Sequence, residues 1–209
     1  MAQIKKEHIK QDIIKNSIKL FKAKGYSNTT IAQIARASKI SVGNVYKYFK
    51  DKYEIFRTIV SKEFMAEMSD ILNIRTVLNV KRLHEELTPQ ELAWYDDVYY
   101  PFFINNSEQC ILLANFSKGT DYELAINSMA KKIMEIKKQE YAKYGKNIIS
   151  DEFSKLSSMI IMSNVELYVR IMSSKEKDST KIELLKLADE YHIQGINNIY
   201  YYLSKKENE

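Results

Sequence analysis

The chain has little of the residues that build several common classes of protein. One cysteine, Cys110, among 209 residues excludes a disulfide framework and any metal site made of several thiolates. Two prolines and five glycines are too few for the many turns of an all-β sandwich. No apolar run approaches the ~18 residues of a membrane-spanning helix, and the N-terminus lacks the apolar core of a signal peptide. We therefore expect a soluble, cytoplasmic, mostly helical protein.

The signatures of common enzyme classes are missing as well. His8, His84 and His192 lie far apart, and no HExxH or ExxH pair is present. The sequence has no Gly-rich phosphate loop and no GxSxG motif. Cys110 stands beside an apolar run, which favours a small buried hydrophobic residue over a redox sensor. We expect no catalytic activity, no metal and no cofactor.

Positive charge is concentrated at the N-terminus. Residues 1–60 hold 13 Lys and Arg against four Asp and Glu, a net charge of +9, whereas residues 61–209 hold 19 against 23, a net charge of −4. A basic head on a mildly acidic body suggests a polyanionic partner. A Lys-rich solvated surface explains the same charge equally well, so charge alone leaves both interpretations open.

The spacing of apolar residues predicts an all-α chain of about nine helices. Gly25 ends the first helix, and hydroxyls at Thr29–Thr30 and Ser41 cap the two short helices that follow, with a tight turn at Lys39 and Ile40 between them. Asp51 caps a long fourth helix, and Pro101 bends or ends the fifth. Gly145 ends the seventh. The expected helices cover 5–24, about 30–38, 42–48, 51–75, 88–103, 108–116, 120–144, 151–173 and 178–203.

Three stretches in the first 60 residues resemble the DNA-binding region of the TetR family of transcriptional regulators. They read GYSNTTIAQIA from Gly25, ISVGNVYKYF from Ile40 and DKYEIF from Asp51, and the resemblance covers about residues 9–60. Some ten positions match at fixed offsets across two turns. One departure is Lys39, which stands where the family usually has Gly and must adopt the turn geometry of Gly at some conformational cost.

The resemblance implies an N-terminal helix-turn-helix head, residues 1–50, and an effector-binding and dimerisation domain, residues 51–209. It implies a homodimer that binds a palindromic double-stranded DNA operator and is released by a small-molecule effector of unknown identity. Because a repressor and an activator need the same head, the sequence does not separate them, and we expect a repressor. The alternative is a helical small-molecule-binding or protein-interaction module without sequence-specific DNA binding.

The third helix is short enough to present only a few side chains to DNA. Val45 and Phe49 are expected to point inward, Val42 to touch a thymine methyl, and Asn44 to read adenine or contact a phosphate. The resemblance assigns Tyr46, Tyr48 and Lys52 to phosphates, although both tyrosines could instead only pack the small domain. The DNA-contact candidates are Thr30, Gln33, Ser41, Val42, Gly43, Asn44, Tyr46, Lys47, Tyr48 and Lys52.

Aromatic residues are dense between Trp94 and Phe103, and such side chains line cavities between helices. Asp96 and Asp97 in this stretch would suit a cationic aromatic ligand. The alternative is that the stripe is ordinary core. The effector candidates are Trp94, Tyr95, Tyr99, Phe103, Phe116, Tyr122, Met162 and Tyr168.

The last helix, 178–203, is apolar on two faces, which is more than its own domain covers. Gly195 in mid-helix fits the close approach of a partner backbone. Two helices from each of two chains would form a four-helix bundle, unless helices 88–145 cover both faces within one chain. The dimer candidates are Ile161, Val165, Tyr168, Leu185, His192, Gly195, Ile196 and Ile199.

Overall fold

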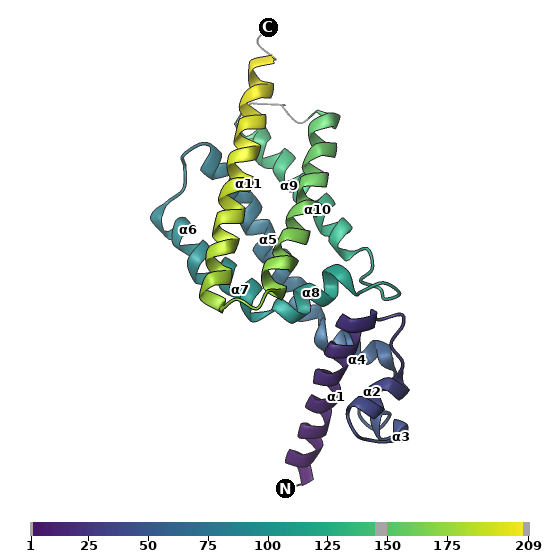
Figure 1. The fold of residues 1–209 in the computed structure, drawn as a ribbon. Coiled ribbons are helices and arrows are strands. Elements are labelled where there is room, and N and C mark those ends of the chain that lie inside the picture. The colour runs from purple at the N-terminus through teal and green to yellow at the C-terminus, as the bar shows by residue number, and fades with distance from the viewer. Residues whose placement is uncertain (1, 145–149, 207–209) are drawn as a thin grey trace. The chain divides into compact units, whose positions relative to one another are not determined.

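The computed structural model describes residues 2–144 and 150–206. Within these ranges every regular element is a helix and no strand occurs, which confirms the predicted all-α class (Figure 1). None of the described helices is both long enough and apolar enough to cross a bilayer.

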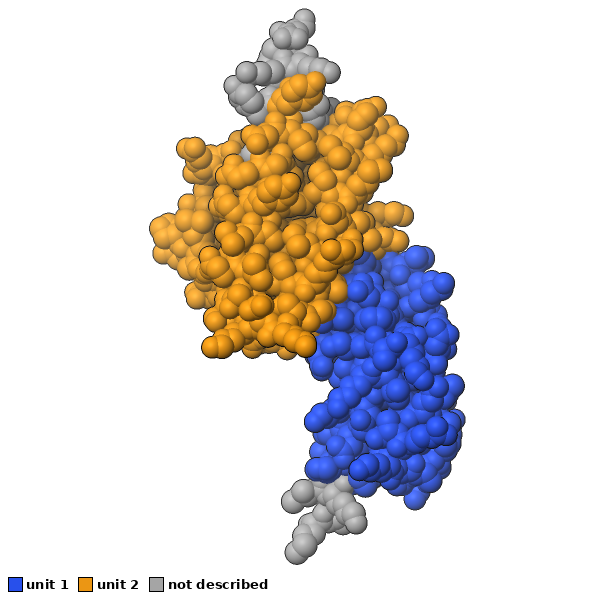
Figure 2. All heavy atoms as spheres, viewed as in Figure 1, with its two compact units in different colours: residues 1–66, 108–126 blue, residues 67–107, 127–209 orange. Residues whose placement is uncertain are grey.

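The chain divides into two compact units (Figure 2). Unit 1 comprises residues 1–66 and 108–126, and unit 2 comprises residues 67–107 and 127–209. The division differs from the expected boundary at residue 50, because a later segment returns to the N-terminal helices. Tyr26 donates its backbone N–H to the carbonyl of Phe116 at 3.3 Å, and the Ser27 hydroxyl donates to the carbonyl of Lys118 at 2.7 Å.

Unit 1 begins with four helices that follow the predicted order. They are α1 (Ala2–Lys24), α2 (Ile31–Ala37), α3 (Val42–Val45) and α4 (Lys52–Ile59). Gly25, at φ +78°, ends α1 and donates its N–H to the carbonyl of Phe21 at 2.8 Å. The side chain of Asp51 caps α4 by accepting from the N–H of Glu54 at 2.7 Å. Phe21, Ile34, Val45 and Phe56 are buried and form the core of this head.

The expected helix 51–75 is wrong as one continuous element. The structure ends α4 at Ile59 and starts α5 (Lys62–Leu83) after a break at Val60 and Ser61. The hydroxyl of Ser61 accepts from the N–H of Phe64 at 3.1 Å, so Ser61 caps a new helix. The third helix is also shorter than 42–48, because α3 ends at Val45 and residues 46–48 form turns.

The remaining helices are α6 (Pro89–Trp94), the π-helix η1 (Tyr95–Tyr99), α7 (Tyr100–Asn105), α8 (Ser107–Asn115), α9 (Ala125–Ala142), α10 (Asp151–Ser173) and α11 (Asp178–Lys206). The chain continues through Pro101 after the wider turn of η1. Proline interrupts an α-helix because its ring clashes with the carbonyl four residues earlier. The wider turn of a π-helix moves this carbonyl away from the ring. Pro101 therefore changes the helix type without ending the helical run.

Helix α9 starts later than the expected residue 120 or 121. The hydroxyl of Thr120 donates to the carbonyl of Ser117 at 2.6 Å, which holds this segment in turns, and the helix begins only at Ala125. Gly145, where we expect the helix to stop, lies outside the described residues.

Candidate functional site

The helix-turn-helix of unit 1 is fixed by two caps and one strained turn. The Thr30 hydroxyl accepts from the N–H of Gln33 at 3.2 Å, and the Ser41 hydroxyl accepts from the N–H of Asn44 at 3.1 Å. Lys39, between α2 and α3, has φ +56°, as predicted for a residue in the position of a turn glycine. This conformation costs an L-residue ~1–2 kcal/mol.

The outer face of α3 is exposed, as a DNA-reading surface requires. Val42 is 41% exposed and Tyr46 is 53% exposed, whereas Val45 and Phe49 are buried as predicted. A Cβ placed on Gly43 would meet no atom within 4 Å, so a partner backbone can approach closely there. Lys47 is exposed as well, and Asn44 and Tyr48 are half-buried.

The side chain of Gln33 has a structural role that was not predicted from the sequence. Its side-chain oxygen accepts from the backbone N–H of Thr30 at 3.1 Å, which completes a capping box with the Thr30 hydroxyl. The capping bond uses only the amide oxygen of Gln33, so a bidentate contact with adenine would compete with the cap, whereas the amide N–H donors remain for a base acceptor. The hydroxyl oxygen of Thr30 accepts the capping bond, which leaves its O–H available as a donor to a phosphate.

Lys52 is also committed to the protein itself. Its ammonium donates to the backbone carbonyls of Tyr26 at 2.6 Å, Thr29 at 2.7 Å and Ser27 at 3.4 Å, and lies 4.1 Å from the centroid of the Tyr26 ring. An ammonium has three N–H donors, so these carbonyls use all of them. The phosphate contact predicted for Lys52 requires at least one of these bonds to break.

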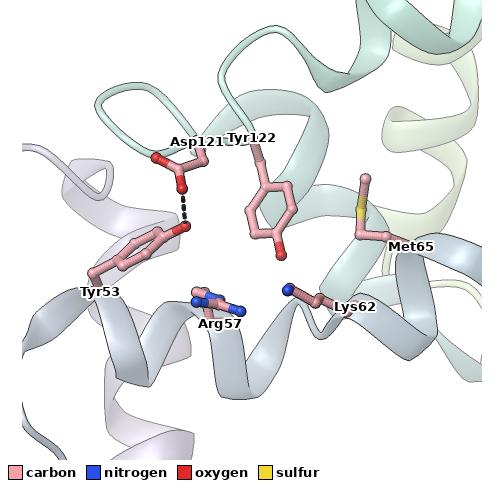
Figure 3. A pocket seen from close by; sticks show the side chains of 6 residues that line it. All are labelled: Tyr53, Arg57, Lys62, Met65, Asp121 and Tyr122. Atoms are coloured by element: carbon pink, nitrogen blue, oxygen red, sulfur yellow. Dashed lines mark hydrogen bonds between the residues drawn. The ribbon is translucent and has the colours of Figure 1, made fainter.

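A shallow pocket of about 310 Å³ lies in unit 1 near the α4–α5 break (Figure 3). The Tyr53 hydroxyl donates to Asp121 at 2.5 Å, and this bond raises the pKa of Tyr53 to about 12. Arg57 and Lys62 are exposed, so their charges are solvated. The lining residues are Tyr53, Arg57, Lys62, Met65, Asp121 and Tyr122.

Five of the eight effector candidates meet in unit 2. Trp94, Tyr95, Tyr99, Phe103 and Tyr168 form a chain of ring contacts with centroid distances of 5.1–5.8 Å. The hydroxyls of Tyr99 and Tyr168 lie 3.2 Å apart. Except for the half-buried Trp94, these aromatic side chains are buried.

The other three effector candidates do not join this group. Phe116 and Tyr122 belong to unit 1, where Tyr122 packs 6.3 Å from the ring of Phe56. Met162 is 41% exposed on α10. Asp96 and Asp97 are exposed rather than among the rings, so they do not provide the expected site for a cation.

Charged residues that the sequence analysis missed lie beside these rings. Arg75 of α5 forms an ion pair with Asp189 of α11, and its guanidinium lies 5.2 Å from the centroid of the Tyr99 ring. Burial disfavours the charge on Arg75, but Asp189, Tyr99 and Tyr168 outweigh this and raise its pKa well above the ordinary value. Lys137 stands on the buried face of α9 with Ala130, Met134 and Tyr141. The sequence does carry a signal for such a residue, because Lys137 is a charged residue at an apolar position of the amphipathic helix α9.

The dimer candidates divide into interior and surface positions. Leu185 is 0% exposed and Tyr168 is 6% exposed, so both serve the interior of unit 2 and not an outer face. Ile196 is buried as well, while Ile161, Val165, His192 and Ile199 are half-buried. Gly195 is exposed, with no atom within 4 Å of an added Cβ. Large apolar residues that are exposed on α10 and α11 are Leu156, Met159, Met162, Leu167, Leu184, Leu187, Tyr191 and Tyr202.

Cys110 is a buried apolar residue, as predicted. It is 5% exposed in α8, and burial raises the pKa of its thiol to about 12. The thiolate that oxidation chemistry requires is therefore scarce at neutral pH.

Comparison with known proteins agrees with the geometry of the head. Residues 13–59 match the family model described as bacterial regulatory proteins, tetR family. The helix-turn-helix regulator YuxN of Bacillus subtilis is 38% identical over 64 residues, which are 31% of this chain and 22% of YuxN. The regulator HbdR of Aromatoleum is 49% identical over 49 residues, which are 23% of this chain and 21% of HbdR. The matches thus span about a fifth of these curated relatives.

A solved structure extends the likeness to the fold of the rest of the chain. A Clostridium perfringens protein described as a fatty acid metabolism regulator has a TM-score of 0.50 at 18% identity and covers 85% of this chain and 97% of its own. At this identity the likeness concerns the fold alone. Residues 13–59 therefore form a helix-turn-helix that resembles the one of the TetR family of bacterial transcriptional regulators.

Proposed function

We propose that this protein is a cytoplasmic repressor that binds a palindromic operator as a homodimer and leaves it when a small molecule binds unit 2. The observation that carries the proposal is the exposed face of α3, where Val42, Gly43, Tyr46 and Lys47 stand free on a strongly basic head. A short exposed helix after a tight turn is the element that enters the major groove in helix-turn-helix proteins.

Dimerisation is supported by the apolar residues left open on the last two helices. Leu187 is 59% exposed and Tyr191 is 81% exposed on α11, and Met159 is 70% exposed on α10. These two helices pack against each other in unit 2, so a second copy would complete a four-helix bundle. An isologous interface of this kind pairs two heads, as a palindrome requires.

Release by an effector requires only that the ligand prefer the dimer geometry that does not fit the operator. A coupling free energy of ~1–3 kcal/mol is typical for such linkage. The aromatic cluster of unit 2, with Tyr99 1% exposed at its centre, supports unit 2 as the place where the effector binds.

Selection of binding sites from random DNA, followed by anisotropy titration, tests the proposal. We expect a palindromic site that the protein prefers over random DNA by ~10³ or more at physiological salt. A basic interaction module would bind all sequences alike, with affinity that falls steeply with salt, and that result would favour the alternative without sequence-specific binding.

A further inference from the structure

Three charged side chains from three helices are largely buried in unit 2 and influence one another electrostatically. They are Arg75 of α5, Lys137 of α9 and Asp189 of α11. Asp189 is 1% exposed, Lys137 is 7% exposed and the side chain of Arg75 is 12% exposed. Charged groups are rarely buried this deeply unless each has a partner, because removing a charge from water is costly.

This cluster has one cation more than it has carboxylates. Arg75 pairs with Asp189, whereas the ammonium of Lys137 makes no hydrogen bond or ion pair with any residue that the structure describes. His192 does not change the balance, because burial, followed by Arg75 and Lys137, lowers its pKa to about 4 and leaves it neutral at pH 7. Burial, followed by the charge of Arg75, lowers the pKa of Lys137 to about 8, so most of this side chain is still protonated at pH 7.

Two further polar atoms of the cluster are unsatisfied. Arg75 Nε and Asp189 Oδ2 are buried and form no hydrogen bond within the described part of the chain. Each such atom costs ~1–3 kcal/mol, and such atoms mark places for a water, an ion or a ligand. Asp189 is the least accessible of the three charged side chains, so the cations are the groups of this cluster that an anion would partner.

We propose that this cluster is the effector site and that the effector is an organic anion whose carboxylate pairs with Lys137 and Arg75 while its apolar body packs on the tyrosines. The inference rests on the proposed function and specifies its ligand. One carboxylate oxygen accepts from the Lys137 ammonium and the other from Arg75 Nε–H, so the anion gives both groups a partner.

The ligand's apolar part has suitable neighbours. The Arg75 guanidinium stacks against the ring of Tyr99, whose ring contacts reach Trp94 at 5.7 Å and Phe103 at 5.1 Å. A carboxylate with an aliphatic or aromatic body therefore matches the cluster at both ends. A cationic ligand would meet two like charges and only one nearly inaccessible carboxylate.

Matched ligands and matched variants test the proposal on the full-length protein. The probes are the straight-chain acids from acetate to decanoate and 3-phenylpropanoate, each compared with its amide and with the corresponding amine. Binding is followed by the melting temperature and by the fluorescence of Trp94, the single tryptophan. The variants are Lys137→Met, which removes the unpaired charge, and Lys131→Met, an exposed lysine of the same helix, as the control.

We expect at least one carboxylate to bind wild type and Lys131→Met more tightly than its amide and its amine do. The affinity for this acid should fall about ten- to hundredfold in Lys137→Met, as charge-assisted hydrogen bonds predict, while that for its amide stays unchanged. Failure to fold does not explain such a loss, because removing a buried unpaired cation stabilises the free protein. Equal binding of acid and amide, preference for an amine, or no binding by any acid overturns the proposal.

Operator binding is measured separately, so the two proposals fail independently. If a carboxylate binds through Lys137 and does not release DNA, the ligand class holds and the proposed regulation fails. If the protein prefers its operator and no carboxylate exceeds its amide, the regulation stands and the ligand class fails.

Discussion

The ammonium of Lys52 lies 2.6 Å from the carbonyl oxygen of Tyr26 and 4.1 Å from the centroid of the ring of the same residue. This contact joins the start of α4 to the turn after α1, across 26 residues of sequence. We therefore expect Lys52 to contribute to the stability of the head.

Replacing Lys52 by Met should lower the free energy of unfolding by about 1–3 kcal/mol, because the buried carbonyls of Tyr26 and Thr29 lose a charged donor. The measurement is thermal or urea unfolding of the variant and of wild type. Lys47→Met is the matched control, since Lys47 is exposed and unbonded within the described residues. We expect Lys47→Met to leave stability unchanged and to reduce the salt slope of DNA binding by about one unit. If Lys52→Met instead leaves stability unchanged and reduces the salt slope of DNA binding, Lys52 contacts a phosphate.

Lys39→Gly should stabilise the head. Lys39 holds φ +56° in the turn between α2 and α3 and is exposed, so glycine removes the strain of a left-handed conformation without removing a packed side chain. We expect a gain of about 0.5–1 kcal/mol in unfolding free energy, which is partly offset by the flexibility of glycine in the unfolded chain. Lys39→Val should lower the free energy of unfolding. If the two variants are equally stable, or if Lys39→Val is the more stable one, the turn is not strained at residue 39.

Alanine variants of Asn44 and Gln33 should differ in their effects, the first on DNA sequence discrimination and the second on the stability of the head. Asn44→Ala should reduce discrimination between operator variants by about 1–3 kcal/mol if its amide makes a bidentate contact with adenine. Gln33→Ala should instead lower the melting temperature, because it breaks the capping box with Thr30. The measurements are anisotropy titrations on single-base operator variants and thermal unfolding. Equal loss on all sequences for Asn44→Ala would assign Asn44 to the DNA backbone.

The sequence predicts the head better than the rest because its determinants are local. Caps at Ser41 and Asp51, the glycine at residue 25 and the motif around Lys39 act within a few residues of their position. The partners of Lys52 and of Arg75 depend on the folded chain, since Arg75 pairs with Asp189 across 114 residues. The break at Ser61 is an intermediate case, because its cap is a local signal that the continuous apolar stripe concealed. Three of the eight effector candidates lie apart from the other five, since an aromatic or apolar residue type alone does not distinguish a core position from a binding site.

The exposed face of α11 should decide the oligomeric state. Leu187→Lys and Gly195→Leu should each shift the protein from dimer toward the 24.5 kDa monomer in sedimentation at micromolar concentration, and operator affinity should fall in parallel. Leu92→Lys is the control, because Leu92 is 50% exposed on α6 and lies outside α10 and α11. A wild-type monomer would contradict the dimer, and a dimer indifferent to both changes would place the interface elsewhere.

Stability should rise with pH above neutrality because of Lys137. Its pKa is lowered by burial, followed by the charge of Arg75, to about 8 in the folded protein, against an ordinary value of 10.5 that applies when the chain is unfolded. Between these values the unfolded state binds more protons, so the free energy of unfolding increases as pH rises from about 8 to 10.5. Below pH 8 the full penalty is present, and a difference of this size corresponds to about 3 kcal/mol.

Comparison of wild type with Lys137→Met isolates this contribution, since Met has no charge to titrate. We expect the variant to be more stable at pH 7 and its advantage to shrink through the window from 8 to 10.5, as measured by urea unfolding at fixed protein concentration. His192 titrates in a separate window, because its pKa of about 4 lies below the ordinary 6.5, and acid should therefore destabilise wild type between these values. The acid effect should be smaller in Lys137→Met, because the charge of Lys137 contributes to this shift. A stability difference that does not change between pH 7 and 10.5 would mean that Lys137 is solvated, and the unpaired interior charge would be lost as a basis for the anion site.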